Sequence, residues 1–255
     1  MKKLFLFLTS LFLTFSFVHA ENINSTSRYI QLIKSKKKRK RDKQEQKPVG
    51  PTLPSSQLIP PSRQADMLEP YRSVQLLPYR LDGWYSNAKQ IERIFKENHI
   101  EVAIEVGCWL GLSTTHIASL LSPDAKLYAI DHWKGSIEHQ AHPLLSMLYE
   151  QFLSNVIWKG LTDKIIPMRM SSLDAVQKVH AMKIVPDFIY IDASHDTASV
   201  LADLNAWFPL VRGHGVICGD DWTWGSVRVA VEMFAMQNNL TIAASDNFWR
   251  LVEDQ

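Results

Sequence analysis

The sequence predicts an α/β domain built on a mostly parallel sheet, and three observations lead to that class. Short apolar runs rich in β-branched residues alternate with amphipathic helical patterns from about residue 84 to residue 252. Most of the apolar runs end in acidic or hydroxyl side chains, as parallel strands do at a ligand-binding edge. A hydrophobic content of 46% in 255 residues is enough for a full core.

The expected elements follow one another in β-α order, and no internal repeat is visible. We expect helices at residues 84–98, 114–121, 143–159, 173–182, 197–208 and 226–237. We expect one strand that ends at Gly107 and further strands at residues 126–130, 164–170, 186–191, 216–218, 240–243 and 248–252. Cys108 and Cys218 fall in or beside these strands, so we expect buried free thiols and no disulfide.

The first strand leads into a turn with glycines at Gly107 and Gly111, and Ser113 and Thr114 open the next helix. Glycines let a ligand approach the backbone, and the first N–H groups of a helix attract an anionic group. Glu105, at the end of the strand, attracts a cation. The turn therefore suits a zwitterionic ligand, although glycines used only for tight packing explain the same residues. A dinucleotide fingerprint fits less well, because it needs a glycine two residues after Gly107.

Polar residues also follow the later strands, and they should converge on one crevice at the carboxyl edge of the sheet. They are Asp131, Ser171 and Ser172, Asp192 with His195, and Asp220 with Asp221. Asp131 stands where an acid accepts hydrogen bonds from a ribose diol, and an acid there also serves as a cap. Three neighbouring carboxylates are costly unless a hard cation or protons neutralise them. The alternative for Asp220 and Asp221 is a capping role for the helix near residue 226.

On these residues, the stretch 84–253 resembles the class I S-adenosylmethionine-dependent methyltransferases. The resemblance implies a Rossmann-like three-layer sandwich with a seven-stranded, mostly parallel sheet and an antiparallel last strand. It also implies that the glycine turn holds the methionine moiety, that the acid after the second strand binds the ribose, and that the residues after the third strand lie near the adenine. The candidate cofactor-binding residues are Glu105, Gly107, Gly111, Ser113, Thr114, Asp131, His132, Trp133, Ser171, Ser172 and Asp192.

Within that superfamily, residues 191–195, the helix with Asp203 and residues 213–221 resemble the metal-dependent O-methyltransferases of the macrocin and sugar-modifying type. This implies a Mg²⁺ ion bound by Asp192, Asp220 and Asp221, and an acceptor that is a sugar or another small molecule with a hydroxyl group. His195 and Asp192 are the candidate catalytic residues, with His195 as the base. Many relatives carry an acid at the position of Ser194, so a supporting role for His195 stays open. Asp203 is expected to face outward.

The amino-terminal part has the composition of a targeting segment followed by a tail. Residues 1–20 have the pattern of a secretory signal peptide: Lys2-Lys3, an apolar run to Val18, and a small-residue cleavage site at Ala20. The sequence thus predicts export to the periplasm or medium, with an uncleaved membrane anchor as the alternative. Residues 21–80 are basic and then rich in proline, so we expect them to be disordered or extended and to add nothing to a core, with the methyltransferase domain at 81–255.

The distribution of charge limits the partners. Residues 1–47 carry 12 basic and 3 acidic side chains, which leaves 16 basic and 23 acidic ones for the rest of the chain. An acidic folded part argues against nucleic-acid contact by the domain. The run 34–43 has the composition of a polyanion or import-receptor site, or of a solvated tail. Because the cofactor is made inside cells, an exported, non-catalytic binding or effector protein on the same fold is the alternative function.

Overall fold

The computed structural model describes residues 61–253 except residues 137–138, 140–141, 212 and 214. All of these residues fall within the compact unit Gly50–Gln255. The predicted signal peptide, the basic run 34–43 and the part of the 21–80 segment before residue 61 lie outside the described residues. In the part of the chain that is described, no helix combines the length and the apolar character needed to cross a bilayer.

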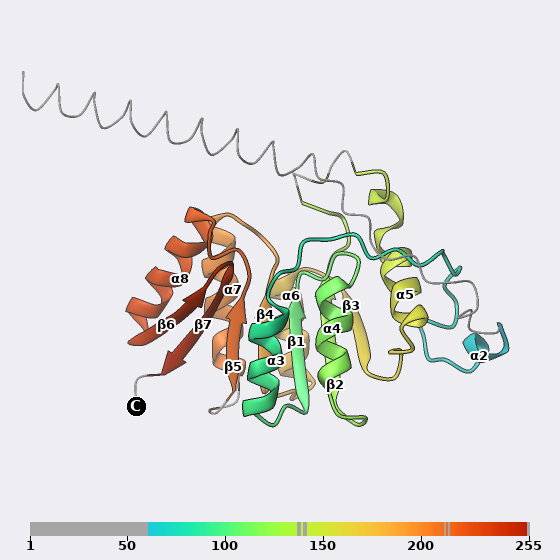
Figure 1. Cartoon of the computed structure of the whole chain (residues 1–255), viewed down its shortest axis with the longest axis horizontal. Helices are drawn as coiled ribbons and strands as arrows, with labels where there is room; N and C mark the ends of the chain where they lie inside the picture. The colour runs from blue at the N-terminus through green and yellow to red at the C-terminus, as the bar shows by residue number, and fades with distance from the viewer. Residues whose placement is uncertain (1–60, 137–138, 140–141, 212, 214, 254–255) are drawn as a thin grey trace, which may run out of the picture. The chain divides into compact units, whose positions relative to one another are not determined.

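One sheet of seven strands forms the centre of the domain (Figure 1). The strand order is β3-β2-β1-β4-β5-β7-β6. Strands β1 to β5 pair in parallel, whereas β7 is antiparallel to both β5 and β6, which confirms the predicted sheet and its antiparallel last strand. The bounds are β1 Val102–Val106, β2 Lys126–Asp131, β3 Ile165–Arg169, β4 Phe188–Ile191, β5 Val216–Gly219, β6 Leu240–Ser245 and β7 Phe248–Glu253.

Helices cover both faces of the sheet, as the predicted three-layer sandwich requires. One core lies between the sheet and α3, α4 and α5, and a second lies between the sheet and α6, α7 and α8 (Figure 1). Neighbouring strand residues such as Ala103 and Ile104 point into opposite cores, because side chains alternate along a strand. Cys108 and Cys218 are buried free thiols, as predicted. The bounds are α3 Ala88–Glu97, α4 Leu112–Leu120, α5 Leu148–Trp158, α6 Ser172–Ala181, α7 Thr197–Trp207 and α8 Gly225–Gln237.

Two helices begin later than the sequence pattern indicates. The helix expected from residue 84 begins at Ala88, because the buried side chain of Asn87 turns into the core and its Nδ2 donates to the Tyr190 hydroxyl at 3.0 Å. The helix expected from residue 143 begins at Leu148, after a short 3-10 turn at Leu145–Met147. Residues 84–87 and 143–147, which precede these two helices, are therefore not part of them.

Residues 61–80, the described part of the segment 21–80, contribute to the core, although nothing in the sequence led us to expect that of them. These residues begin with the short helix α2 (Pro61–Ala65), and Tyr71 is buried in the core with its hydroxyl donating to the Ile165 carbonyl at 2.8 Å. Polar side chains of α5 then bind the extended backbone that follows. For example, Asn155 accepts from the Arg80 N–H at 2.9 Å and donates to the Arg80 carbonyl at 2.7 Å. Proline-rich composition did not reveal this segment as part of the domain, because its backbone is held by side chains of a distant helix.

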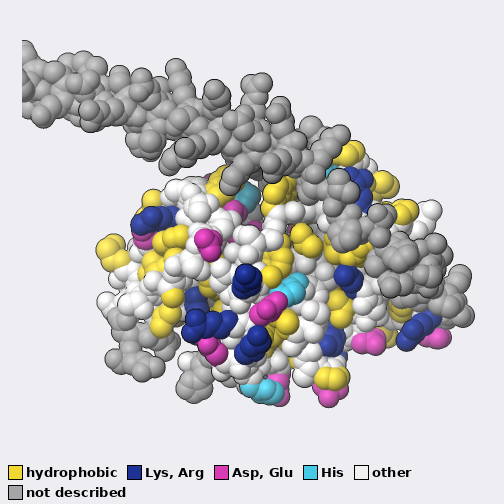
Figure 2. All heavy atoms as spheres, in the orientation of Figure 1, with side chains coloured by type: hydrophobic (Ala, Val, Ile, Leu, Met, Phe, Trp, Pro, Cys, Tyr) yellow, Lys and Arg dark blue, Asp and Glu magenta, His cyan; other side chains and the backbone are white. Residues whose placement is uncertain are grey.

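The surface of the described part carries charges of both signs. On the face shown in Figure 2, Lys and Arg side chains lie interspersed with Asp and Glu side chains. The absence of nucleic-acid contact stays a prediction.

Candidate active site

The acids that follow four strands meet at one edge of the sheet. Val106 of β1 lies in register with Ile130 of β2 and Ile191 of β4, and Ile191 lies in register with Gly219 of β5. These four strands thus end side by side, and the polar residues at or just after their ends occupy the same rim. The register confirms the predicted convergence of the strand ends. It places the glycine turn after β1 next to the acid cluster at β4 and β5.

The glycines of the turn serve the packing of the protein itself. Gly107 has a φ of 90°, and a Cβ atom there would lie 2.0 Å from the Asp192 carbonyl oxygen. Gly111 has a φ of 88° immediately before α4, and a Cβ atom there would lie 3.2 Å from the Phe152 ring. A side chain at Gly107 would push apart the ends of β1 and β4. The packing of the protein itself therefore requires glycine in this turn, whether or not the turn also binds a ligand.

Asp131 is committed to the same turn. Its Oδ2 accepts hydrogen bonds from the backbone N–H groups of Cys108 and Trp109, both at 3.0 Å, and its Oδ1 accepts from the Trp133 N–H at 2.7 Å. Trp109 has a φ of 49°, an unusual conformation for a residue with a large side chain. A carboxylate that accepts three N–H groups stabilises such a turn. The structure therefore gives Asp131 a turn-holding role, and its predicted contact with a ribose stays a prediction.

Glu105 is a fully buried acid beneath the turn. Its Oε1 accepts a hydrogen bond from the Ser113 hydroxyl of α4. Burial raises the pKa of Glu105 to about 7, against the opposing effect of the Ser113 hydrogen bond. Within the described residues, Glu105 Oε2 and the buried Thr114 hydroxyl make no hydrogen bond of full geometry, although the Thr114 hydroxyl lies close enough to lower the pKa of Glu105. Buried polar atoms of this kind are satisfied by a ligand or by water, so the pair marks a place where a donor group fits.

The two serines after β3 have structural partners. Ser171 is the N-cap of α6, where its hydroxyl accepts from the Asp174 N–H at 3.2 Å. Ser172 donates to Asp203 at 2.5 Å and accepts from the Trp207 indole at 2.8 Å. The expectation that Asp203 faces outward is wrong: it is buried at the α6–α7 contact, and burial raises its pKa. Contact of either serine with an adenine stays a prediction.

Of the two aromatic residues after Asp131, only one is accessible. Trp133 is 3% exposed and packs against Tyr149 and Phe152 with ring centroids 4.7 Å away in each case. Its indole N–H donates to the Trp109 carbonyl at 2.8 Å. The Trp133 ring is thus part of the core, and its contact with a cofactor stays a prediction. His132 is half exposed and stays a candidate.

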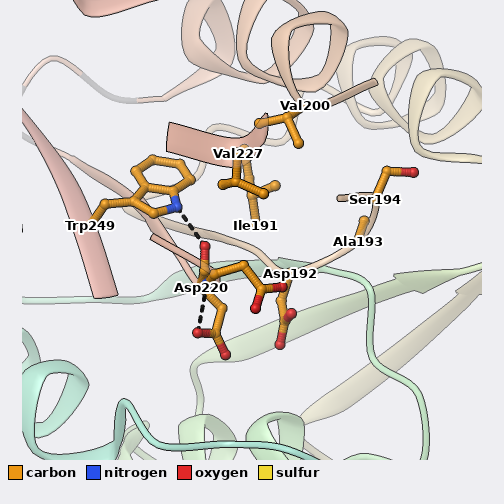
Figure 3. A pocket seen from close by; sticks show the side chains of 9 residues that line it. Ile191, Asp192, Ala193, Ser194, Val200, Asp220, Val227 and Trp249 are labelled. Carbon is orange, nitrogen blue, oxygen red and sulfur yellow. Dashed lines mark hydrogen bonds between the residues drawn. The ribbon is translucent and has the colours of Figure 1, made fainter. Parts of the chain in front are cut away.

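The acids after β4 and β5 line one small pocket. Asp192, Asp220 and Asp221 lie there beside apolar residues of α7, α8 and β7 (Figure 3). Burial, and next the charges of Asp220 and Asp221, raise the pKa of Asp192 well above its ordinary value. Burial also raises the pKa of Asp220. The pocket thus concentrates negative charge, which favours the binding of a proton or a cation.

The donor set that could hold a metal ion differs by one residue from the predicted set. Ligand atoms of Asp192, His195 and Asp221 all lie within 4.8 Å of one another, and Asp220 is not part of this group. His195 Nε2 lies 2.7 Å from Asp221 Oδ2, and the His195 ring stacks on Trp224 with centroids 4.5 Å apart. Two carboxylates and an imidazole fit a divalent cation. This donor set has His195 in place of Asp220, and the predicted trio of Asp192, Asp220 and Asp221 stays a prediction.

Sequence reasoning missed two groups of residues at this edge. Asn247, in the turn between β6 and β7, donates to Asp220 at 2.5 Å and to Asp221 at 3.3 Å. In addition, Trp109 packs on His139 with centroids 4.2 Å apart, and His139 stacks on Trp84, which is 60% exposed. The tryptophans at positions 84 and 109 were the only sign of this second group in the sequence. No local pattern points from residue 247 to residue 220.

Comparison with known proteins agrees with this architecture. Residues 104–222, from β1 to the loop after β5, match a family described as a methyltransferase domain. An O-methyltransferase from Bacillus cereus, solved in complex with S-adenosylhomocysteine, has a TM-score of 0.54 and 20% identity over 70% of this chain and 84% of that one. The O-methyltransferase TomG from Streptomyces achromogenes, solved with S-adenosylmethionine, has a TM-score of 0.55 and 17% identity over 80% and 92%. A search of curated proteins found no match.

The fold and the convergent edge define a Rossmann-like α/β domain. The residues that build this edge lie within the part of the chain, 104–222, that matches the methyltransferase-domain family.

Proposed function

We propose that the chain transfers the methyl group of S-adenosylmethionine to a hydroxyl oxygen of a small molecule. The observation that carries the proposal is the single edge where the glycine turn of β1 adjoins the acid cluster of β4 and β5. A methyl donor on the turn and a hydroxyl group at the cluster would lie next to each other. Proximity of this kind is the main contribution an enzyme makes to methyl transfer.

The donor would lie on the turn between β1 and α4. The unpaired Oε2 of Glu105 offers an acceptor for the ammonium group of the methionine moiety, and the Thr114 hydroxyl offers a further polar contact. The first N–H groups of α4 suit its carboxylate. Asp131, which keeps the turn in shape, and the half-exposed His132 lie where the nucleoside would follow.

A divalent cation would be held by Asp192, His195 and Asp221. Their donor atoms are close together, and burial and the charges of Asp220 and Asp221 raise the pKa of Asp192, which favours a proton or a cation there. When bound, such a cation lowers the pKa of a substrate hydroxyl. The apolar side chains of Val200, Val227 and Trp249 line the same pocket and would exclude water from it.

The transfer itself is a single displacement. The hydroxyl gives its proton to His195, or to solvent water where His195 is a cation ligand. Its oxygen forms a bond to the methyl carbon, and the carbon–sulfur bond breaks with its electron pair remaining on sulfur. The products are the methyl ether and neutral S-adenosylhomocysteine.

The 2.7 Å contact between His195 and Asp221 favours a second mechanism that needs no metal ion. In it, Asp221 orients the imidazole, and His195 accepts the hydroxyl proton as a general base. The two mechanisms differ in one measurement. Chelator-treated enzyme should lose turnover and recover it with Mg²⁺ or Mn²⁺ if the three side chains hold a cation, and should keep full turnover if His195 acts alone.

We retain a sugar or a similar polyol as the acceptor class. The support is the sequence resemblance to sugar-modifying enzymes and the exposed Trp84, whose ring face is a surface on which a sugar ring can stack. The test is a screen of hydroxyl compounds with radiolabelled S-adenosylmethionine, paired with calorimetry of cofactor binding. Micromolar cofactor binding with turnover supports the enzyme. Absence of cofactor binding would favour the exported, non-catalytic scaffold.

We also propose that the chain is exported. The support is the order of Lys2-Lys3, the apolar run to Val18 and the small residue Ala20. Amino-terminal sequencing of the protein recovered from cells tests this: a mature chain that begins at Glu21 supports cleavage, and a chain that retains residues 1–20 contradicts it.

A further inference from the structure

The turn between β6 and β7 reaches back to the acid cluster. β7 runs antiparallel to β5 with Trp249 opposite Gly219, so the residues just before Trp249 lie beside the residues just after Gly219. Asn247 stands at that point, and its backbone carbonyl accepts from the Trp222 N–H at 3.0 Å. A side chain from the end of the chain is thereby fixed next to Asp220 and Asp221.

The orientation of the Asn247 amide follows from its partners. The Thr223 backbone N–H, which can only donate, lies 3.3 Å from Asn247 Oδ1, and the Thr223 hydroxyl donates to the same oxygen at 2.6 Å. The amide NH₂ group must therefore face the other way. There it donates to Asp220 Oδ1 at 2.5 Å and to Asp221 Oδ1 at 3.3 Å.

The hydrogen bonds made by Asp220 differ from those made by Asp221. Asp220 Oδ1 also accepts the Asp221 N–H at 2.7 Å. Both lone pairs of this one carboxylate oxygen are therefore used. The Asp220 carbonyl accepts from the Trp249 indole at 2.8 Å, which fixes the backbone as well (Figure 3). Asp221, by contrast, has a φ of 63° and turns its Oδ2 toward His195 at 2.7 Å. Only Asp221 joins the donor set with Asp192 and His195.

We propose that Asn247 is a positioning residue that holds Asp220 out of the cation site and leaves Asp192, His195 and Asp221 as its ligands. Asp220 then contributes negative charge to the pocket without contributing a ligand atom. The inference rests on the cation site of the proposed function. It goes beyond that proposal because it gives Asp220 and Asp221 different roles. It attributes this difference to Asn247, which lies in the turn between β6 and β7.

The test measures binding of Mn²⁺ to the purified full chain by electron paramagnetic resonance, without any methyl acceptor. The variants are D220N, D221N, N247A and the double variant D220N/N247A. The D220N change keeps the Oδ1 acceptor and removes only the charge. N238A is the control, because the exposed Asn238 also donates from its amide, to the Phe234 carbonyl at 2.9 Å, but lies at the end of α8. Binding of S-adenosylhomocysteine reports that each variant is folded.

We expect D221N to weaken Mn²⁺ binding by about tenfold or more and D220N to weaken it by less than about threefold. In the N247A background Asp220 is released toward the cation, so D220N should then weaken binding by about tenfold. N238A should bind Mn²⁺ as the wild type does. If N247A does not fold, N247L replaces it, because Leu matches Asn in the branching of its side chain at Cγ, lacks the donor and adds no charge.

Three results would overturn the inference. The first is a D220N variant that loses Mn²⁺ as strongly as D221N does. The second is a D220N effect that is equally small with and without Asn247. The third is a wild-type protein that binds no Mn²⁺. Failure of methyl transfer alone, with the expected pattern of Mn²⁺ affinities, would refute the proposed reaction and leave the role of Asn247 intact.

Discussion

Replacing Asp131 with Asn should destabilise the whole domain, because its carboxylate holds the turn after β1. The amide oxygen can keep the two bonds from Cys108 and Trp109, but the NH₂ group then faces the Trp133 N–H. Leaving one donor unsatisfied costs about 1–3 kcal/mol, and weakening two charge-assisted bonds to neutral ones costs about 1 kcal/mol each. Discounted for the 15% exposure of the side chain, the loss should be about 2–4 kcal/mol.

The measurement is urea unfolding of D131N without ligand, with D124N as the control, since Asp124 is exposed in the loop before β2. For a domain of this size, a loss of about 2–4 kcal/mol also lowers the Tm by about 4–16 °C. A D131N variant as stable as D124N would refute the turn-holding role. If that variant also bound S-adenosylmethionine more weakly, Asp131 would be a ribose ligand only.

Three further predictions concern the same edge. Because the folded-state pKa of Glu105 is about 7, above its ordinary value, the unfolding free energy of the ligand-free protein should fall as pH rises from about 4.5 to about 7. The E105Q variant should lack about 3 kcal/mol of that fall. Urea unfolding at several pH values measures this, and an equal dependence of the unfolding free energy on pH in the wild type and in E105Q would contradict it. G107A should cost more than about 4 kcal/mol, because its Cβ would lie 2.0 Å from a backbone carbonyl. G160A, with a positive φ and open space around it, should cost only about 1 kcal/mol; similar losses in soluble yield and stability would refute the packing argument. S172A should cost about 1–3 kcal/mol by leaving buried Asp203 without its donor, while the Kd for S-adenosylhomocysteine stays unchanged. A selective loss of cofactor affinity would instead place Ser172 at the adenine.

The order of the strands along the chain and the residues at their ends could be predicted from the sequence alone. Period-two and period-3.6 patterns are local, and parallel strands must end at a common edge, so Glu105, Asp131, Asp192 and Asp220 were expected together. The same reasoning failed for Asp203, which was expected to face outward and is buried. Whether a side chain near the end of a strand or on a helix faces solvent depends on what packs over it, and neighbouring residues do not show that.

The composition and spacing of this chain determined its fold class, its glycine turn and the acidic character of its carboxyl edge, because each depends on residues close together in sequence. Only the tertiary structure decided how the acids are used. Asp131 is engaged by backbone N–H groups of another strand end, and Asp220 is held by Asn247, 27 residues away along the chain. A carboxylate can accept only a few hydrogen bonds, so the partners brought to it by the fold decide which acids stay available to a ligand.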